Sequence, residues 1–437
     1  MTTQIVTVNV TQTLAPAPNT LQSTGALVSQ GATTLAAGSS QLLTQFADLS
    51  SILTGAVTIS SMVTSGTAPS ITVTVTTASA HGIPTGDTIL GIIAGVTPTG
   101  YNGTYQITST GTNTFTYPLT TNPGAVTIQG VFTNESVQDL VAMATTYFAQ
   151  GSANGIYVLE LGAGTGAQGV TALGSYITAN PLKYYAYCVT TEMSSDATMV
   201  TLARNNSATT AQVYFWVTET ISSYGAFKGI KSVISMVQDN NAPVTEWSIA
   251  AMMYNALAYS PSDTNKVAPM AFQYIVGVTP FSGTNAQCQL LKTANVNYVG
   301  TGAEGGISNT LVLWGVNCDG NDYTYWYSVD WVQITINLFI SNAIINGSNN
   351  PINPLYYNQA GINRLQKVAQ GVMNSGIAYG LVLSPVTVNA VTFVTYVTDN
   401  PSDYAIGKYA GLSVTYTPAR GFIQIIFNVN VSSFALV

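Results

Sequence analysis

The sequence contains very few charged residues. Of its 437 residues, 10 are Lys or Arg and 17 are Asp or Glu, so 6% are charged, whereas a typical globular protein carries about 25%. Enzymes, nucleic-acid-binding proteins and soluble monomers need charge for catalysis, for phosphate contacts and for solubility. Since 46% of the residues are hydrophobic, we expect most of the surface to be covered by other protein, as in a subunit of a large assembly.

Histidine and cysteine are also scarce. His81 is the only histidine, which excludes multi-histidine metal sites and leaves no credible Cys/His or Ser/His/Asp catalytic arrangement. The three cysteines, Cys188, Cys288 and Cys318, form no CxxC pair, and their odd number favours reduced thiols. The net charge of −7 and the pI of about 4.5 argue against a nucleic-acid partner.

Two further absences concern membranes and targeting. There is no uninterrupted run of about 18 apolar residues, so no membrane-spanning helix and no direct membrane insertion are expected. The first residues, Met1–Gln4, lack the basic region that opens a signal peptide. The length allows two to four domains at roughly 100–200 residues each.

Both ends of the chain have strand-like patterns. Residues 1–30 are predicted to form an extended arm, with a frayed terminus as the alternative; Pro16 and Pro18 follow an alternating segment there. The final segment, from about residue 420 to 437, is too apolar for a free tail, because its backbone groups and side chains need partners. We therefore predict that both segments pair with sheets of adjacent subunits. The residues concerned are Ile5, Val6, Val8, Val10, Phe422, Ile423, Ile425, Ile426, Phe427, Val429 and Val431.

Between the ends, the composition changes three times. Residues 31–57 are expected to be the first part of a core. Residues 58–132 are rich in Thr, Gly and Val, with turn pairs such as Asn102-Gly103, and predict a small β-sandwich or barrel inserted into the core. Its strands are expected at residues 71–76, 88–93, 105–108, 114–117 and 125–130. Residues 133–325 alternate strand and helix patterns, which predicts an α/β domain. Its later part is expected to contain a strand near residues 272–278 and a helix near residues 285–293. The predicted fold is thus an α/β (α+β) core with an inserted all-β domain and extended β terminal arms.

Residues 326–437 are predicted to supply C-terminal helices and strands of this core, but their patterns conflict. Val332, Ile334, Ile336, Leu338 and Ile340 alternate as in a strand, although the apolar positions continue as far as residue 345 without a turn signal. A helix is indicated for residues 358–374, where apolar side chains line one face. Strands are predicted for residues 391–397, 412–416 and 422–431.

One glycine-rich segment is similar to a cofactor-binding motif. Residues 162–169 follow a predicted strand and open a predicted helix, and Gly164, Gly166 and Gly169 satisfy G-x-G-x-x-G. Glu192, after the next strand, stands where a ribose-binding acid is expected. The segment resembles the first motif of class I methyltransferases. However, no acid/base or substrate motif follows, so we expect a flexible loop, no cofactor and no enzyme.

The order of several segments resembles a known family. These are Val329-Asp330-Trp331 with the long apolar element after it, Tyr357–Ile362 leading a helix, Asn180–Tyr187, and Leu412–Phe422. Together they are similar to the contractile-tail sheath proteins of myophages, and most of all to a shorter sheath-like family. Residues 80–87, 101–105 and 113–117 resemble a small β module of phage structural proteins.

This resemblance implies a structural role in a virion tail assembled in the host cytoplasm. It implies hexameric rings stacked around a tail tube, terminal arms that add strands to neighbouring subunits, contraction on host attachment, and contacts with tube, baseplate and tail terminator proteins. It also implies that residues 330–346 are helical, against the alternation. The alternatives are a methyltransferase-like enzyme, a tube or capsid protein, and an adhesin-like β protein.

Overall fold

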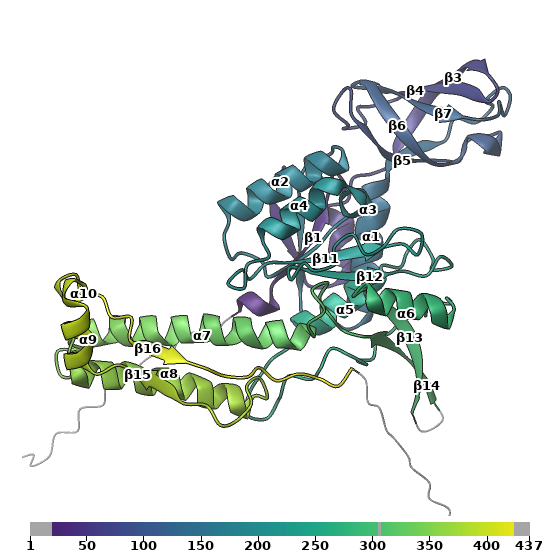
Figure 1. Cartoon of the computed structure of the whole chain (residues 1–437). Helices are drawn as coiled ribbons and strands as arrows, with labels where there is room; N and C mark the ends of the chain where they lie inside the picture. Colours follow the sequence, from purple (N-terminus) through teal and green to yellow (C-terminus); the bar gives the residue numbers. More distant parts are fainter. Residues whose placement is uncertain (1–19, 305–306, 424–437) are drawn as a thin grey trace, which may run out of the picture. The chain divides into compact units, whose positions relative to one another are not determined.

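The structure is a computed structural model that describes residues 20–304 and 307–423 (Figure 1). These residues belong to two compact units. The first contains Ser262–Lys266 and Ser328–Pro418, and the second contains Leu21–Pro261, Val267–Tyr327 and the chain from Ala419 onward. The mixed α/β class predicted from the sequence is confirmed.

The second unit is built on an eight-stranded sheet of order β14-β13-β12-β11-β10-β1-β9-β2. The strands from β13 to β9 in this order run parallel, whereas the strands at the two edges, β14 and β2, are antiparallel to their neighbours. The strands are β1 Gly25–Ser29, β2 Ser40–Leu43, β9 Ile156–Glu160, β10 Ala186–Cys188, β11 Tyr214–Glu219, β12 Val233–Val237, β13 Asn297–Glu304 and β14 Ile307–Leu313.

The central position of β1 corrects the N-terminal boundary. The sequence assigned residues 1–30 to an arm, but all five residues of β1 are buried between β9 and β10. A short run with apolar side chains on both faces suits an interior strand of a parallel sheet. A Cβ on Gly25 would lie 2.6–2.9 Å from side-chain atoms of Leu257, Met253 and Ile156, so this strand packs too closely for a larger residue.

Helices cover both faces of this sheet (Figure 1). α2 and α4 pack over side chains that include Val28 and Leu159, and α5 packs over the face that bears Gly25, with α1 beside it. The helical elements of this unit are η1 Leu21–Ser23, η2 Phe46–Ser51, α1 Glu135–Ala149, α2 Gly166–Ala179, α3 Thr191–Ser195, α4 Ala197–Asn205, α5 Ser248–Leu257 and α6 Asn285–Thr293.

Between β2 and α1 the chain forms a closed antiparallel barrel of order β3-β4-β7-β6-β5-β8. Its core consists mainly of aliphatic residues around Phe115, Tyr117 and Phe132. The elements are β3 Val57–Thr67, β4 Ser70–Thr77, β5 Thr88–Ala94, η3 Thr99–Tyr101, β6 Gly103–Gly111, β7 Thr114–Leu119 and β8 Val131–Asn134. His81 is a loop residue of this barrel, with Nε2 2.8 Å from the Gly111 carbonyl and Nδ1 accepting the Ile83 N–H.

The described part of the first unit contains two long helices and short elements that follow them. These are α7 Tyr323–Ser348, which begins in the second unit, α8 Gln359–Ala378, β15 Val388–Ala390, α9 Phe393–Asp399, α10 Pro401–Ala405 and β16 Leu412–Val414. Residues 330–346 lie in α7 and are helical, as the family resemblance implies. The strand suggested by their alternating apolar residues is wrong. The strand predicted for residues 391–397 is also wrong, because Thr392 caps a helix there by accepting the Thr395 N–H.

By length and composition alone, α7 could also cross a membrane, which the sequence did not predict. Of the most apolar 18-residue window of this helix, a share of 28% is buried inside the structure. The same helix contains Asp330, whose side chain is fully buried. A core helix of a soluble protein can pass the same test of length and composition.

Candidate functional site

The glycine-rich loop is fixed from within by Glu160. This last residue of β9 has its side chain 1% exposed. Its carboxylate accepts hydrogen bonds from Ser29 Oγ at 2.6 Å and from the Gly31 and Gly162 N–H groups, both at 2.7 Å. The loops after β1 and β9 are therefore joined through one carboxylate, which takes up the N–H groups of Gly31 and Gly162.

Gln30 occupies the crevice in which a nucleotide would bind. In open α/β sheets, ligands bind where the strand order reverses, and here β9 and β10 lie on opposite sides of β1. Gln30 follows β1; its Nε2 donates to the Thr165 carbonyl at 3.1 Å and its Oε1 accepts from Thr190 Oγ1 at 2.6 Å. A Cβ on Gly169 would lie 2.3 Å from Gln30 Nε2. The third motif glycine thus makes room for this glutamine.

The proposed ribose acid has a structural partner as well. Glu192 Oε1 accepts the N–H of Leu90 in the barrel strand β5, and a Cβ on Gly166 would lie 2.3 Å from the Glu192 carbonyl oxygen. Burial raises the pKa of Glu192 to about 7. The residues of this segment are used for packing and do not fit a dinucleotide or S-adenosylmethionine. Within residues 20–304 and 307–423, no three His, Cys, Asp or Glu side chains are placed to hold a metal ion.

Most of the residues predicted to pair with neighbouring subunits lie outside the described ranges. Ile5, Val6, Val8 and Val10 precede residue 20, and Ile425, Ile426, Phe427, Val429 and Val431 follow residue 423. Phe422 and Ile423 are described, and neither belongs to a strand of this chain. The Phe422 side chain is 79% exposed. Strand pairing by these residues stays a prediction.

The segment before Phe422 is anchored to the second unit. Arg420 Nη2 donates to Asn321 Oδ1 at 3.0 Å, and its guanidinium lies 4.1 Å from the centre of the Tyr325 ring. The Gly421 N–H donates to Asp322 Oδ2 at 2.9 Å. The chain is therefore fixed to the second unit as far as Gly421.

The first unit contains a two-stranded sheet, β15–β16, whose two outer edges differ. Val388 of β15 donates its N–H to Gln370 Oε1 at 2.9 Å, and its carbonyl accepts from Gln366 Nε2 at 2.8 Å. These two glutamines are four residues apart on α8 and so lie on one helix face. Together with the packing of α8 against β15, these bonds cover the outer edge of the strand.

The outer edge of β16 has no such cover. Val388 pairs with Val414, and the Val388 backbone groups point to α8, so by antiparallel geometry the Val414 groups point away from β15. The same alternation applies to Leu412. No hydrogen bond joins these outward groups to any other described residue. An open strand edge readily pairs with another strand.

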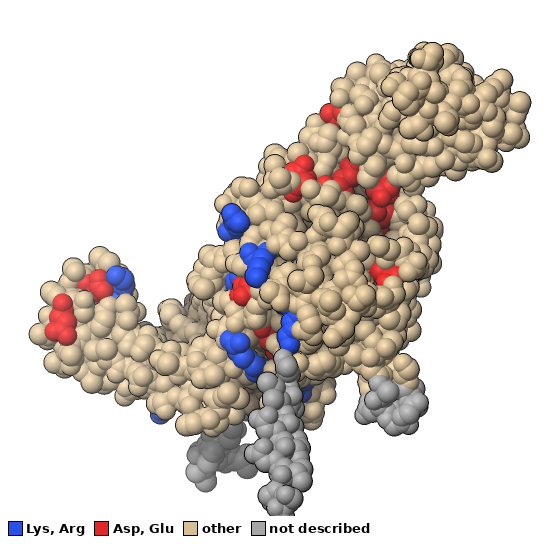
Figure 2. All heavy atoms as spheres, turned by 45° about the vertical axis from the view of Figure 1, so that its right-hand side comes forward, with Lys and Arg blue, Asp and Glu red and all other residues tan. Residues whose placement is uncertain are grey.

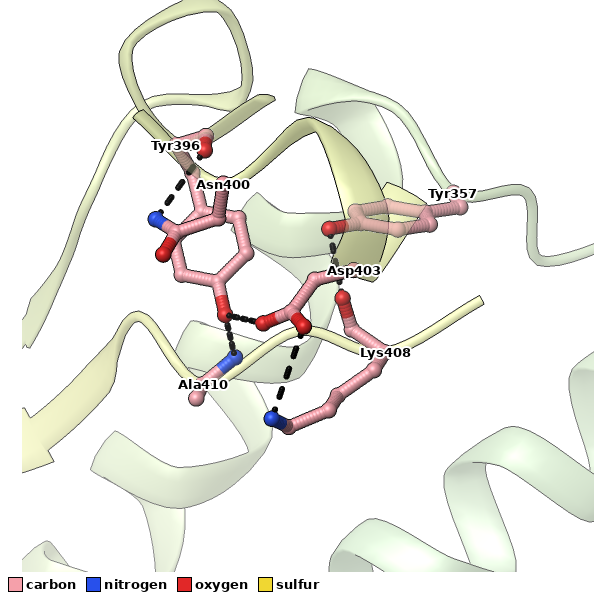
Figure 3. A network of polar contacts seen from close by, with 6 residues as sticks. All are labelled: Tyr357, Tyr396, Asn400, Asp403, Lys408 and Ala410. Atoms are coloured by element: carbon pink, nitrogen blue, oxygen red, sulfur yellow. Dashed lines mark hydrogen bonds and ion pairs between the residues drawn. The ribbon is translucent and has the colours of Figure 1, made fainter. Parts of the chain in front are cut away.

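A polar network fixes the chain that leads into β16 (Figure 3). Tyr396 donates its hydroxyl to Asp403 Oδ2 at 2.7 Å and accepts the Ala410 N–H at 2.9 Å. Lys408 Nζ lies 3.5 Å from Asp403 Oδ1, and the Tyr357 hydroxyl donates to the Lys408 carbonyl at 2.8 Å. The hydrogen bond to Asp403 raises the pKa of Tyr396. The network holds the open edge in a defined place.

Comparisons with known proteins bear on the fold. No protein-family model matches the sequence, and no curated protein is similar to it. A chain in the cryo-EM structure of the contracted anti-feeding prophage baseplate has a TM-score of 0.50 at 12% identity, over 98% of this chain and 97% of that chain. The chain shares the fold of that baseplate component.

Two crystal structures of sheath tail proteins are similar as well. The protein from Listeria innocua has a TM-score of 0.43 at 11% identity, over 93% of this chain and 94% of that chain. The protein from Desulfitobacterium hafniense has a TM-score of 0.41 at 11% identity, over 87% and 93%. The fold shared with the contracted anti-feeding prophage baseplate component is the finding that supports the resemblance to contractile-tail proteins.

The sequence did not reveal Gln30, Gln366, Gln370, Tyr396 or Asp403 as important positions. Glutamine and tyrosine are common in this chain, and nothing in their local spacing marks a strand edge. The one available signal is the spacing of Gln366 and Gln370, four residues apart on a predicted helix. Their role depends on a strand that follows them by about 20 residues, which only the tertiary structure brings near.

Proposed function

We propose that the chain is the structural subunit of a phage contractile tail sheath. In this proposal, subunits stack as hexameric rings around a tail tube, and the array contracts to drive the tube through the host envelope. The observation that carries it is the fold shared with a component of the contracted anti-feeding prophage baseplate, over nearly the whole of both chains. Baseplate and tail terminator proteins would bind the ends of the array.

The β15–β16 sheet supports strand exchange as the means of assembly. A two-stranded sheet is marginal on its own, one of its edges is open, and each added strand contributes main-chain hydrogen bonds. In the proposal, residues 5–10 or 422–431 of a neighbouring subunit pair with β16. Since Gln366 and Gln370 cover the outer edge of β15, strands add on the β16 side only. Such links survive movement of the rigid parts during contraction.

Electron microscopy of purified full-length protein and of two truncations tests this function. Full-length protein should form tubes, whereas deletion of residues 1–14, or truncation after Gly421, should leave a folded and soluble but unassembled subunit. The second truncation retains the Arg420 and Gly421 contacts, so any loss of tubes is due to the arm. Tubes formed by truncated protein would contradict strand exchange, and shells or lone monomers from the full chain would contradict the sheath.

A further inference from the structure

The barrel meets the rest of the second unit at a junction that contains several carboxyl groups. β8 ends at Asn134 and α1 begins at the next residue, so the two elements are joined without a loop. Side-chain hydrogen bonds also cross the junction. Glu192 Oε1 of α3 accepts the Leu90 N–H of β5. Gln168 Nε2 of α2 donates to Asp87 Oδ1 of the barrel at 3.0 Å. The barrel is therefore held by the chain and by contacts that involve acidic side chains.

Three carboxyl groups lie together on α1 and α3 beside this junction. Glu135 and Asp139 are four residues apart on α1 and so share one helix face. Asp139 is 4% exposed, and its Oδ2 accepts the N–H of Thr191, the residue before Glu192, at 2.8 Å. On the barrel side, Asp87 Oδ2 is buried and has no hydrogen-bond partner among the described residues. Acidic groups are thus concentrated where the barrel meets the helices.

The groups that surround this carboxyl cluster do not balance its charge. A cavity of about 760 Å³ is lined by Glu135 and Asp139, and none of its lining residues is Lys or Arg. Figure 2 shows acidic side chains close together on one face without basic ones between them. The titratable groups that face the cluster from the other elements are thus acids or a thiol. They are Cys188 on β10, Asp196 at the N-cap of α4, and Glu219, Asp239 and Glu246 around the cavity.

Burial keeps protons on the cluster. It raises the pKa of Glu192 from 4.5 to about 7, and it raises the pKa values of Glu135 and Asp139 as well. Repulsion by Asp139 and Glu192 raises the pKa of Glu135 further. In an open junction, water would hydrate these groups, and their pKa values would return toward the ordinary ones. The closed junction therefore binds more protons than the open one, so a rise in pH favours opening.

We propose that this junction is a pH-dependent joint, which holds the barrel in place when its carboxyl groups are protonated and releases it as they ionise. Ionised carboxylates that lie close together in a buried site repel one another, and hydration relieves the repulsion. The barrel has a core of its own, so it can move as one body. Each proton that the closed form holds more tightly shifts the balance toward opening by about tenfold per pH unit.

Pulsed electron paramagnetic resonance on spin-labelled full-length protein tests the proposal. Labels on Val63→Cys in the barrel and Leu182→Cys in the loop after α2, both at exposed positions, measure a distance across the joint. Labels on Leu182→Cys and Leu290→Cys measure a distance that does not cross it. The background is Cys288→Ser, because the other two cysteines are buried. Dilution with unlabelled protein restricts the measurement to distances within one subunit.

We expect a narrow Val63–Leu182 distance distribution at about pH 5.5 that becomes broad by about pH 9, whereas the Leu182–Leu290 distribution should stay narrow. Glu135→Gln cannot ionise and should raise the midpoint of the broadening by about one pH unit or more, because one group linked to opening is removed. Asp263→Asn, which removes an exposed charge from the first unit, should leave the midpoint unchanged.

Three results would overturn the proposal. They are a Val63–Leu182 distribution that is the same at both pH values, a midpoint in Glu135→Gln equal to that of the wild type, and equal broadening of the Leu182–Leu290 distance, since the whole unit would then be unfolding. If Glu135→Gln does not fold by circular dichroism, Glu192→Gln gives the same test and keeps an acceptor for the Leu90 N–H. None of these measurements requires tubes, so the joint can be refuted while the proposed sheath function stands.

Discussion

The hydroxyl of Tyr396 lies 2.7 Å from Asp403 Oδ2 and also accepts the N–H of Ala410 at 2.9 Å. One side chain thus joins α9 to α10 and to the segment that enters β16. Asp403 in turn accepts from Lys408 on the same segment. The open edge of β16 is held by contacts that lie outside the sheet, so its position can be tested without altering the strands.

Replacing Tyr396 with phenylalanine should loosen this edge. Tyr396→Phe removes the donor to Asp403 and leaves the Ala410 N–H without its acceptor, which should lower the free energy of unfolding by about 1 kcal/mol. We expect fewer and shorter tubes as well, because β16 is less well placed. Urea denaturation and electron microscopy measure the two effects. Tyr404→Phe is the matched control, because it also removes one tyrosine hydroxyl and keeps the ring that contacts Tyr357 and Phe393. The Tyr404 side chain is 48% exposed.

A proline in β16 should separate folding from assembly. The Val414 N–H points away from β15, so Val414→Pro removes a donor available to an incoming strand while the β15–β16 hydrogen bonds remain. We expect a folded subunit that forms no tubes. Val414→Ala keeps the N–H and should still assemble. Tubes of normal length from the proline variant would show that β16 is not the accepting edge.

The stability of the second unit should fall as the pH rises. The Glu192 pKa is raised from 4.5 to about 7 in the folded protein, so between these values the unfolded chain loses a proton that the folded chain keeps. Its contribution is therefore complete below pH 4.5 and is lost as the pH rises through 7. Thermal unfolding from pH 4.5 to 8 measures this slope, and Glu192→Gln should flatten it.

The control for this pH effect is Asp263→Asn, which should leave the slope as in the wild type. Glutamine at position 192 keeps an oxygen that can accept the Leu90 N–H, so the change tests the charge and not the contact with the barrel. If the slope in Glu192→Gln equals that of the wild type, other groups determine the pH dependence.

Sequence analysis predicted helices and strands correctly where the local sequence pattern matches which side chains are buried. Helix α6 was predicted as residues 285–293, where Thr284 supplies a cap for Gln287, and four barrel strands were predicted from alternation between turn residues. Strand β1 was missed because five residues carry little pattern, and its partners lie more than 100 residues away. In α7, the apolar residues that alternate between 332 and 340 point to several sides of the helix. Their alternation therefore does not indicate a strand.

Two other mismatches have local causes. The strand predicted for residues 272–278 is absent because Phe272 has a positive φ of 67° and only Tyr274 forms a β-bridge there. The strand predicted for residues 125–130 is reduced to one bridge at Ile128, and β8 begins at Val131 instead. The open edge of β16 could not be predicted from the sequence. It is recognised only because Gln366 and Gln370 of α8 bind the backbone of Val388 in β15, which the tertiary structure alone shows.

The barrel should fold on its own if it is cut at the boundaries that the structure shows. Residues 57–134 include all six strands and a separate core, so this fragment should unfold cooperatively with a β-type circular dichroism spectrum. The shorter fragment 58–132 should be less stable, because it lacks the Thr133 and Asn134 pairs with β5. Phe132 packs 4.9 Å from Phe115 between ring centres, and Phe132→Ala should cost about 3–5 kcal/mol. Val63→Ala, at a side chain that is 63% exposed, should cost far less. An unfolded 57–134 fragment would mean that the barrel depends on its contacts with Gln168 and Glu192.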